Sequence, residues 1–375
     1  MIARKLEKTI IAVLFVVMNV QAQDITSPII HPDGSVTFLY YNPDAKNVKV
    51  VSDCLRRRPD HSAFGEKTRT EKMTCDSLGI WSLTTRPLLP EVYSYNYIVD
   101  GTQIPDPSNA DSAYVLLHKV SHFAIGGTER TNLYLPAPAD KRGHIDSLSY
   151  YSEQQGITRR LLVYVPNGCN EHTKLPVLFL LHGVSGDELS WLEHGKATCI
   201  LDNLTAQGKI PPMLVVMPDC NVVRKIMRGK RTNILRNMFN YPALCRGEFE
   251  RDFHELEDFV ASRYNISPLR QDHAIAGLSS GARQAANIAK LQPDTFATVA
   301  LFCPVVHRRQ IPDSSDSVYQ VYVGTDDMFY NNGKNCYRRL KKNGVNCTLY
   351  ETQGGHTWRS WREFLTVFLP TLFSE

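Results

Sequence analysis

Hydrophobic positions follow one pattern in the first third of the chain and another in the remainder. Before residue 118, short apolar and aromatic runs alternate with turn residues such as Pro32-Asp33-Gly34, and no segment has the period of a helix. The strand-like runs span residues 35–40, 48–51, 80–84 and 92–99. This pattern predicts a small all-β, immunoglobulin-like sandwich over residues 23–117.

The later segments predict a different class of domain. Residues 176–181 and 274–278 are continuous apolar runs of the kind buried in a parallel sheet, and residues 282–291 follow the second run as a helix. Further strands are predicted near residues 147–151, 160–165, 318–323 and 348–351. We therefore predict an α/β domain over residues 143–375. Residues 118–142, rich in Gly, Pro and Ala, are interpreted as the linker.

The junction between the apolar run at 274–278 and its helix contains Gly277-Leu278-Ser279-Ser280-Gly281. A GxSxG turn between a strand and a helix is the setting of a nucleophile elbow, in which a strained backbone projects a serine hydroxyl. Glycines on both sides leave room for this turn. Ser279 is therefore the candidate nucleophile.

A serine nucleophile needs a base and an orienting acid, which follow it in the order Ser, Asp, His in this type of domain. Asp326 and Asp327 come directly after the predicted strand at 318–323, and His356 follows the strand at 348–351. The carboxyl ends of parallel strands meet at one edge of a sheet. We therefore expect the serine, one of the carboxylates and the histidine to converge there.

An oxyanion hole is predicted from backbone amides. The strand at 176–181 leads into His182-Gly183-Val184, so the amides of Val184 and Ser280 are the natural donors to a developing oxyanion. Four features in the required order favour a serine hydrolase over an ordinary strand-to-helix turn.

The segments around these residues resemble those of a known family. The matching blocks are PVLFLLHG, LDNLTAQGKIPPMLVVMP, HAIAGLSSG, VGTDD and QGGHTW. They look like those of the Putative esterase (esterase D and feruloyl esterase-like) family of α/β-hydrolases, over about residues 140–375. That family includes feruloyl esterases, S-formylglutathione hydrolases, siderophore esterases and mycolyltransferases. The resemblance implies Ser279 as nucleophile, His356 as general base and Asp327 as orienting acid, with neither a metal nor an organic cofactor.

One departure concerns the elbow, which usually reads GLSMGG in this family. Here Ser280 and Ala282 replace the Met and the last Gly. Ser280 keeps the backbone amide that the oxyanion hole needs, whereas the methyl group of Ala282 must fit where the helix packs close to the sheet.

The N-terminal blocks HPDGSVTFLYYNPDAKNVKVVSD, GIWSLTTRPLLPEVYSYNYIVDG and DPSNA resemble the E-set modules that precede many such esterases and are related to glycogen-binding modules. Trp81, Tyr93, Tyr95 and Tyr97 could form a sugar platform. However, the tyrosines recur at every second position of one strand, a period that favours a core face.

Residues 1–22 have the pattern of a secretory signal, with a basic start, an apolar stretch at 10–17 and Val20-Gln21-Ala22 before the cut. The apolar stretch is shorter than the roughly 20 residues of a membrane span, so a retained anchor is disfavoured. We expect an exported protein, periplasmic or secreted, with no stable membrane insertion of the mature chain. Removal of the predicted signal takes away three basic residues and one acidic residue and lowers the formal charge from +4 to +2, which argues against nucleic acid or a membrane surface as a primary partner.

All nine cysteines follow the predicted cut, and none forms a CxxC pair, so a structural zinc site is not expected. Pairing of Cys54 with Cys75, Cys220 with Cys245 or Cys336 with Cys347 is compatible with export. Buried free thiols are the alternative.

The combined patterns predict an exported serine carboxylic-ester hydrolase acting on an ester-bearing small molecule or polysaccharide. The resemblance points to feruloyl or acetyl groups of a plant cell-wall polysaccharide such as xylan. Trp191 and Trp358 are candidate walls of an acyl pocket, with simple packing as the alternative. Every proposed catalytic group follows Arg142, so a fragment starting there is expected to cleave small esters.

Two other functions remain open. A siderophore esterase would use the same triad, and the basic residues between Arg224 and Arg236 would suit an anionic ferric complex, although that segment also fits a solvated loop. The predicted signal counts against this function. A non-catalytic carbohydrate-binding protein would have no need of the triad.

Overall fold

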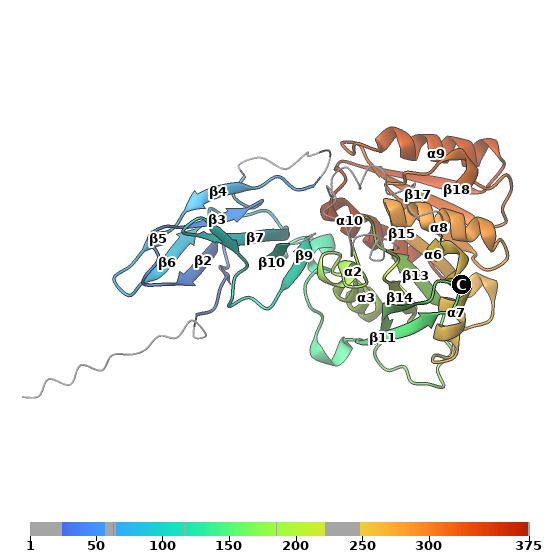
Figure 1. The fold of residues 1–375 in the computed structure, drawn as a ribbon, viewed down its shortest axis with the longest axis horizontal. Helices are drawn as coiled ribbons and strands as arrows, with labels where there is room; N and C mark the ends of the chain where they lie inside the picture. Colours follow the sequence, from blue (N-terminus) through green and yellow to red (C-terminus); the bar gives the residue numbers. More distant parts are fainter. Residues whose placement is uncertain are drawn as a thin grey trace, which may run out of the picture.

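The computed structural model describes residues 25–56, 63, 65–115, 118–184, 186–221 and 248–373. Two parts follow one another along the chain, an all-β part and a larger part in which helices cover both faces of a sheet (Figure 1). The predicted signal at 1–22 and the basic residues between Arg224 and Arg236 lie outside the described residues.

The N-terminal part contains two antiparallel sheets. The first has the order β1 (Ile29–Ile30), β2 (Val36–Tyr41), β6 (Ile80–Thr84), β5 (Thr74–Cys75). The second has the order β4 (Arg69–Lys72), β3 (Val48–Ser52), β7 (Glu91–Val99), β10 (His118–Ile125), β9 (Ser112–Val115), with β8 (Thr102–Ile104) paired to β7. All four strands predicted from the pattern are present.

Aromatic side chains fill the core between these sheets. Phe38 of β2 packs against Tyr95 of β7 and Phe123 of β10, with ring centroids 4.8 and 5.8 Å away. Tyr93, Tyr95, Tyr97 and Trp81 are all buried. Tyr95 and Tyr97 donate their hydroxyls to one carboxylate oxygen of Asp106, at 2.7 and 3.0 Å, which satisfies these polar groups inside the core. These four aromatics therefore stabilise the core and form no exposed sugar platform.

The structure differs from the predicted linker in its first residues. His118–Ile125 is strand β10, which pairs with β7 in the register Phe123 opposite Tyr93. Only its second half is buried, so its alternation is too short to stand out in the sequence. The helices α1 (Glu129–Asn132) and η2 (Ala139–Lys141) follow before the second part.

The second part is built on an eight-stranded mixed sheet. Its order is β11 (His144–Ser152), β12 (Ile157–Val165), β14 (Leu214–Pro218), β13 (Val177–Leu181), β15 (His273–Leu278), β16 (Thr298–Phe302), β17 (Val318–Gly324), β18 (Cys347–Thr352). The pairs of β12 with β11 and β14 are antiparallel, and the others are parallel. Every residue of β13 and β14 is buried, as expected for strands covered on both faces.

Helices cover both faces of this sheet. One face packs against α7 (Phe253–Ala261), α8 (Ser280–Leu291) and α9 (Tyr330–Lys342). The other packs against α2 (Ser190–Glu193), α3 (Ala197–Ala206) and α10 (Trp358–Phe368). Shorter elements are α6 (Glu248–Arg251), η3 (Arg270–Asp272), η4 (Arg308–Gln310) and η5 (Leu369–Thr371). This is an α/β-hydrolase-type domain, as the sequence predicted.

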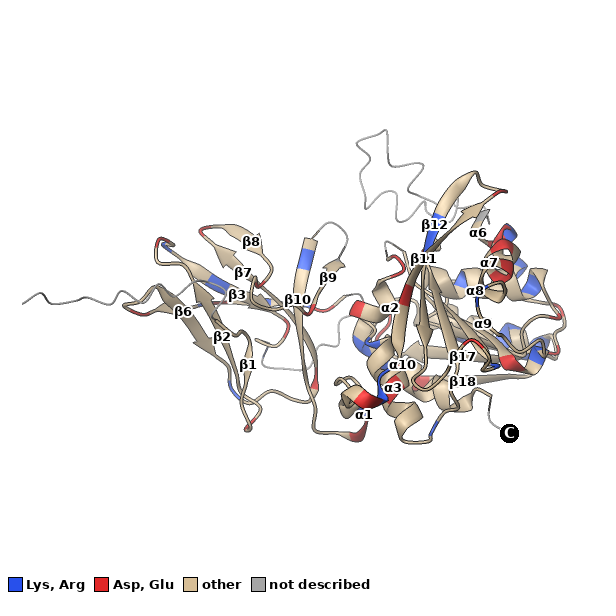
Figure 2. Ribbon diagram, turned by 90° about the horizontal axis from the view of Figure 1, so that it is seen from below, with Lys and Arg blue, Asp and Glu red and all other residues tan. Residues whose placement is uncertain are grey.

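The N-terminal part packs against the face that carries α2, α3 and α10 (Figure 1). Ion pairs join the two parts: the guanidinium of buried Arg362 lies 3.2 Å from the carboxylate of buried Glu91. The ammonium group of Lys196 lies 2.6 Å from Asp111. Acidic and basic residues are interspersed over the drawn ribbon (Figure 2), and no described helix has the length and apolar character needed to cross a bilayer.

The described cysteines are free thiols: Cys54, Cys75, Cys169, Cys199, Cys220, Cys303, Cys336 and Cys347. Of the two alternatives, free thiols rather than disulfides therefore apply to these eight residues. Cys245 lies outside the described residues.

His194 makes this interface sensitive to acid. Its ring is buried between Trp358, on which it stacks at 5.2 Å, and His122 of β10 at 5.0 Å. Burial lowers the pKa of His194 to about 4. The imidazole of the unfolded chain binds a proton near pH 6.5, whereas that of the folded chain stays neutral until about pH 4. The free energy of unfolding therefore keeps its full contribution from His194 above pH 6.5 and loses up to about 3 kcal/mol as the pH falls to 4.

We expect the stability advantage of the wild type over His194→Gln to shrink as the pH falls from 7 to 4, because glutamine does not titrate. Chemical denaturation of both proteins at several pH values measures it. Other titrating groups, such as Asp53, whose pKa burial raises to about 7, are common to both proteins. A stability difference that stays constant with pH would contradict a neutral His194 in the folded state.

Candidate active site

Ser279 lies at the sharp turn between β15 and α8. Its backbone has φ 53° and ψ −111°, a strained conformation for a residue with a side chain. Its amide donates to the Phe302 carbonyl of neighbouring β16 at 2.8 Å. A Cβ atom on Gly277 would lie 2.4 Å from the backbone of Gly281, so only glycine fits there. The local structure is the strand, turn and helix that a nucleophile elbow requires.

The loop after β13 lies directly against the elbow. A Cβ on Gly183 would come 3.5 Å from the Cβ of Ser279, and a Cβ on Gly281 would come 2.3 Å from the His182 carbonyl. Ser280 is the first residue of α8, so its amide has no acceptor within the helix. Val184 follows Gly183 in the turn beside the serine. The amides of Val184 and Ser280 thus belong to two segments that meet at Ser279.

His182 holds this loop in place, a role that the sequence did not reveal. The Cys220 amide donates to its Nε2 at 3.1 Å, so the ring proton lies on Nδ1, which donates to the Gly183 carbonyl at 2.7 Å. The ring is 2% exposed. His182 therefore connects the loop after β14 to the loop after β13, and it fixes the peptide group that contains the Gly183 carbonyl and the Val184 N–H.

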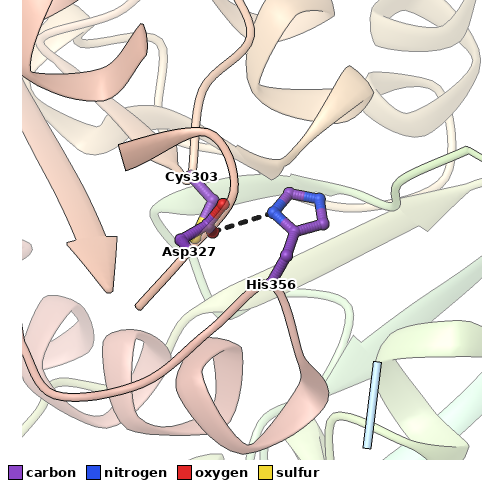
Figure 3. A group of neighbouring side chains, drawn as sticks. All are labelled: Cys303, Asp327 and His356. Atoms are coloured by element: carbon purple, nitrogen blue, oxygen red, sulfur yellow. Dashed lines mark hydrogen bonds and ion pairs between the residues drawn. The ribbon is translucent and has the colours of Figure 1, made fainter. Parts of the chain in front are cut away.

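Asp327 and His356 form a buried pair at the carboxyl end of β17 and β18 (Figure 3). The Nδ1 of His356 lies 2.9 Å from Oδ2 of Asp327. A carboxylate only accepts hydrogen bonds, so Nδ1 carries the proton and Nε2 is the nitrogen that can take one from a nucleophile. The Phe329 amide donates to the other carboxylate oxygen of Asp327 at 2.6 Å. Both side chains are nearly inaccessible to water, which strengthens their interaction.

Asp326 occupies a different position from its neighbour. It is half-buried, and its amide donates to the Gly354 carbonyl at 2.9 Å. That bond joins the loop after β17 to the loop that carries His356. Of the two adjacent carboxylates, Asp327 is the one bonded to Nδ1 of His356, in the register that the resemblance implied.

Cys303 stands beside this pair, although no sequence motif marks it (Figure 3). It follows β16 and has φ 48°. Its Sγ, a carboxylate oxygen of Asp327 and a ring nitrogen of His356 all lie within 4.8 Å of one another. Burial and the adjacent Asp327 carboxylate raise the pKa of the thiol. A protonated thiol is a poor metal ligand, and Nδ1 of His356 is already hydrogen-bonded to the Asp327 carboxylate. The geometry therefore favours proton transfer by His356 over binding of a metal ion. The position of Cys303 after a parallel strand at the same sheet edge was the available signal.

The two tryptophans differ in their surroundings. Trp191 is 1% exposed, and its indole N–H donates to the Leu181 carbonyl at 3.1 Å. This placement favours packing within the core over contact with a substrate. Trp358 is half-buried and contacts Trp361 edge-on at 5.1 Å, while Trp361 contacts the His356 ring at 5.0 Å. The ring of Trp361 thus contacts both Trp358 and His356.

Comparison with known proteins finds similarity to esterases. Residues 152–335 match the family model described as Putative esterase. An endo-1,4-beta-xylanase/feruloyl esterase of Xylanibacter ruminicola is 27% identical over 358 residues, which cover 92% of this chain and 46% of the relative. The chain thus spans less than half the length of this curated relative.

Solved structures show the same fold. An enterobactin esterase of Shigella flexneri superposes with a TM-score of 0.60 at 18% identity, covering 89% of this chain and 92% of that one. A CE1 ferulic acid esterase of Anaeromyces mucronatus gives 0.54 at 21% identity, covering 64% of this chain and 94% of that one. Residues 152–335 therefore resemble the Putative esterase family, and these solved structures share the fold of the chain.

Proposed function

We propose that this chain is an exported serine carboxylic-ester hydrolase that removes feruloyl, or else acetyl, groups from a plant cell-wall polysaccharide such as xylan. The buried pair of Asp327 and His356, with Nδ1 and Oδ2 2.9 Å apart, carries the proposal. It lies at the sheet edge where the elbow presents Ser279. A histidine that is oriented by a carboxylate at that edge is the requirement for activating a serine hydroxyl.

The proposed mechanism assigns one role to each group. Ser279 Oγ attacks the ester carbonyl while Nε2 of His356 takes its proton, and Asp327 stabilises the resulting imidazolium. The amides of Val184 and Ser280 bind the oxyanion of the tetrahedral intermediate. His356 then returns the proton to the leaving alcohol, and a water molecule repeats the sequence to release the acid. His182 keeps the oxyanion loop in position.

The proposed organisation is a signal peptide at 1–22, an E-set or immunoglobulin-like module, a linker and the hydrolase domain. Two antiparallel sheets around one aromatic core support the module. Since β10 belongs to its second sheet, the module extends to Ile125 and the linker is shorter than 118–142. N-terminal sequencing of protein recovered outside the cytoplasm tests export, and a mature chain beginning at Gln23 is the expected result.

Ferulate is proposed over acetate as the acyl group. The Xylanibacter relative, named as a xylanase/feruloyl esterase, aligns with 92% of this chain, including the N-terminal part. A pocket for ferulate needs an aromatic wall. Trp358 is half-buried and contacts Trp361, which in turn contacts His356. An acetyl pocket needs no such surface.

We expect kcat/KM to be higher for feruloylated arabinoxylan fragments than for acetylated xylan fragments of equal length. Liquid chromatography of the released acids from a doubly substituted xylan measures both reactions together, with Ser279→Ala as the blank. Release of acetate without ferulate would overturn the preference for ferulate.

A siderophore esterase is the second candidate, because the Shigella enterobactin esterase superposes on 89% of this chain and thus on both of its parts. The predicted export signal favours the polysaccharide. Incubation with ferric enterobactin distinguishes the two: hydrolysis of that ester alone would move the assignment. A purely carbohydrate-binding role would leave the buried Asp327 and His356 pair without a purpose.

A further inference from the structure

The N-terminal part contacts the backbone of the candidate catalytic histidine. Between β3 and β4, the carbonyl of Ala63 accepts a hydrogen bond from the His356 amide at 3.1 Å, and the Gly65 amide donates to the His356 carbonyl at 3.2 Å. The two bonds engage both backbone polar groups of His356, as a paired strand would. We call Ala63, Gly65 and Glu66 the histidine strap.

The strap also reaches the loop that carries the acid. The Ala63 carbonyl accepts a second hydrogen bond, from the Met328 amide at 3.2 Å. Met328 is the residue after Asp327. One carbonyl group of the N-terminal part therefore connects the two loops whose side chains form the pair of Asp327 and His356.

The histidine loop needs such support because its own sequence provides little. Gly354 and Gly355 come directly before His356, and Gly354 has φ 154°. Two adjacent glycines give this segment great conformational freedom, so the backbone direction at His356 must be set by its contacts. The strap provides those contacts on one side, and helix α10, which begins at Trp358, provides them on the other.

Charged groups hold α10 to the same part of the molecule. The Glu91 carboxylate, at the start of β7, lies 3.3 Å from Arg359 and 3.2 Å from Arg362. The Arg359 amide donates to Glu66 of the strap at 3.4 Å. Glu91 and Arg362 are buried, so this arrangement is shielded from solvent and well suited to hold one geometry.

From these contacts we infer that the N-terminal β-sheet part completes the catalytic centre, its histidine strap acting as a positioning element that sets the backbone of His356 against Asp327. The inference rests on the proposed esterase function. It reverses the expectation that a fragment starting at Arg142 keeps activity on small esters, because such a fragment lacks Ala63, Gly65 and Glu91.

The sharpest variant is Gly65→Pro in the full chain, since proline has no amide hydrogen to donate to the His356 carbonyl and cannot adopt the φ of +66° at this position. A misplacement of about 1 Å at a catalytic group can cost on the order of 10²-fold. We expect kcat for p-nitrophenyl acetate to fall at least about tenfold with KM changed less than about threefold. Gly65→Asn keeps the amide and tolerates positive φ, and a Cβ there meets nothing within 4 Å, so it should restore most of kcat.

Two readouts separate positioning from a loss of stability. A weaker Asp327 and His356 pair disfavours the imidazolium, so the acid limb of the kcat/KM profile should move to lower pH in Gly65→Pro. The low-field proton NMR resonance of the Nδ1–H in that pair should shift or broaden in the same variant. This resonance can be measured without turnover, so it tests the strap independently of esterase activity. If the resonance responds but the protein hydrolyses no ester, the proposed function fails and the role of the strap stands.

Arg359→Met is the second variant, for the case in which Gly65→Pro does not fold. It removes one ion pair between Glu91 and α10, and it should lower kcat and shift or broaden the Nδ1–H resonance. Its matched control is Arg130→Met, which removes an ion pair with Glu363 farther along α10 and should lower stability alone. Folded Gly65→Pro and Arg359→Met proteins with wild-type kcat, acid limb and resonance would overturn the inference.

Discussion

Replacing Ser279 by alanine is expected to lower the turnover of p-nitrophenyl acetate by several powers of ten while leaving the fold intact. The loss of a triad nucleophile removes the covalent pathway altogether, and what remains is catalysis by the oxyanion hole and binding. Alanine adopts the same strained backbone at φ 53° as serine does, so the elbow should persist. Steady-state kinetics and circular dichroism of the purified variant test both parts.

The neighbouring serine supplies the matched control. Ser280 is proposed to act through its amide, so Ser280→Ala should keep turnover within about tenfold of the wild type. Wild-type turnover by Ser279→Ala would contradict the assignment of the nucleophile. Loss of activity in Ser280→Ala alone would assign that role to the other serine of the turn.

Exchanging Asp327 for asparagine is expected to lower kcat by about four orders of magnitude, because an amide favours the wrong tautomer of the histidine and cannot stabilise the imidazolium. Nδ1 of His356 is 2.9 Å from the Asp327 carboxylate. Asp326→Asn should have a far smaller effect, because it leaves that hydrogen bond intact. Measuring kcat for both variants on one small ester compares two adjacent carboxylates in the same loop.

The ranking of these two variants decides the register of the loop. A larger loss in Asp326→Asn would mean that the chain is shifted by one residue in the active protein. Equal and small losses would mean that neither carboxylate orients His356, and the proposed serine mechanism would then lack its acid.

Much of this architecture could be predicted from local patterns. The strand at 274–278, the glycines around Ser279 and the helix after it are near neighbours in the chain, and their conformations follow from apolar periodicity and from the space that glycine leaves. The four strands predicted for the N-terminal part are present for the same reason. The placement of Asp327 and His356 after β17 and β18 followed from the rule that parallel strands end at one edge.

Contacts between distant segments could not be predicted in this way. Strand β10 has a weak alternation of its own and is defined by pairing with β7, so the sequence alone favoured a linker there. Trp191 lies close in sequence to the loop after β13, yet its ring turns inward because the Leu181 carbonyl and the aromatic core provide its partners.

The class of each part and the candidate catalytic residues could be predicted from the sequence, because they depend on short-range periodicity, turn chemistry and the order of motifs. Packing between distant segments places Cys303 beside Asp327, lets His182 hold the loop after β13 and bonds Ala63 and Gly65 to His356. The strap works through main-chain amides and carbonyls, which nearly every residue possesses, so no side-chain pattern marks it. Its partner becomes defined only when the two parts of the chain pack together.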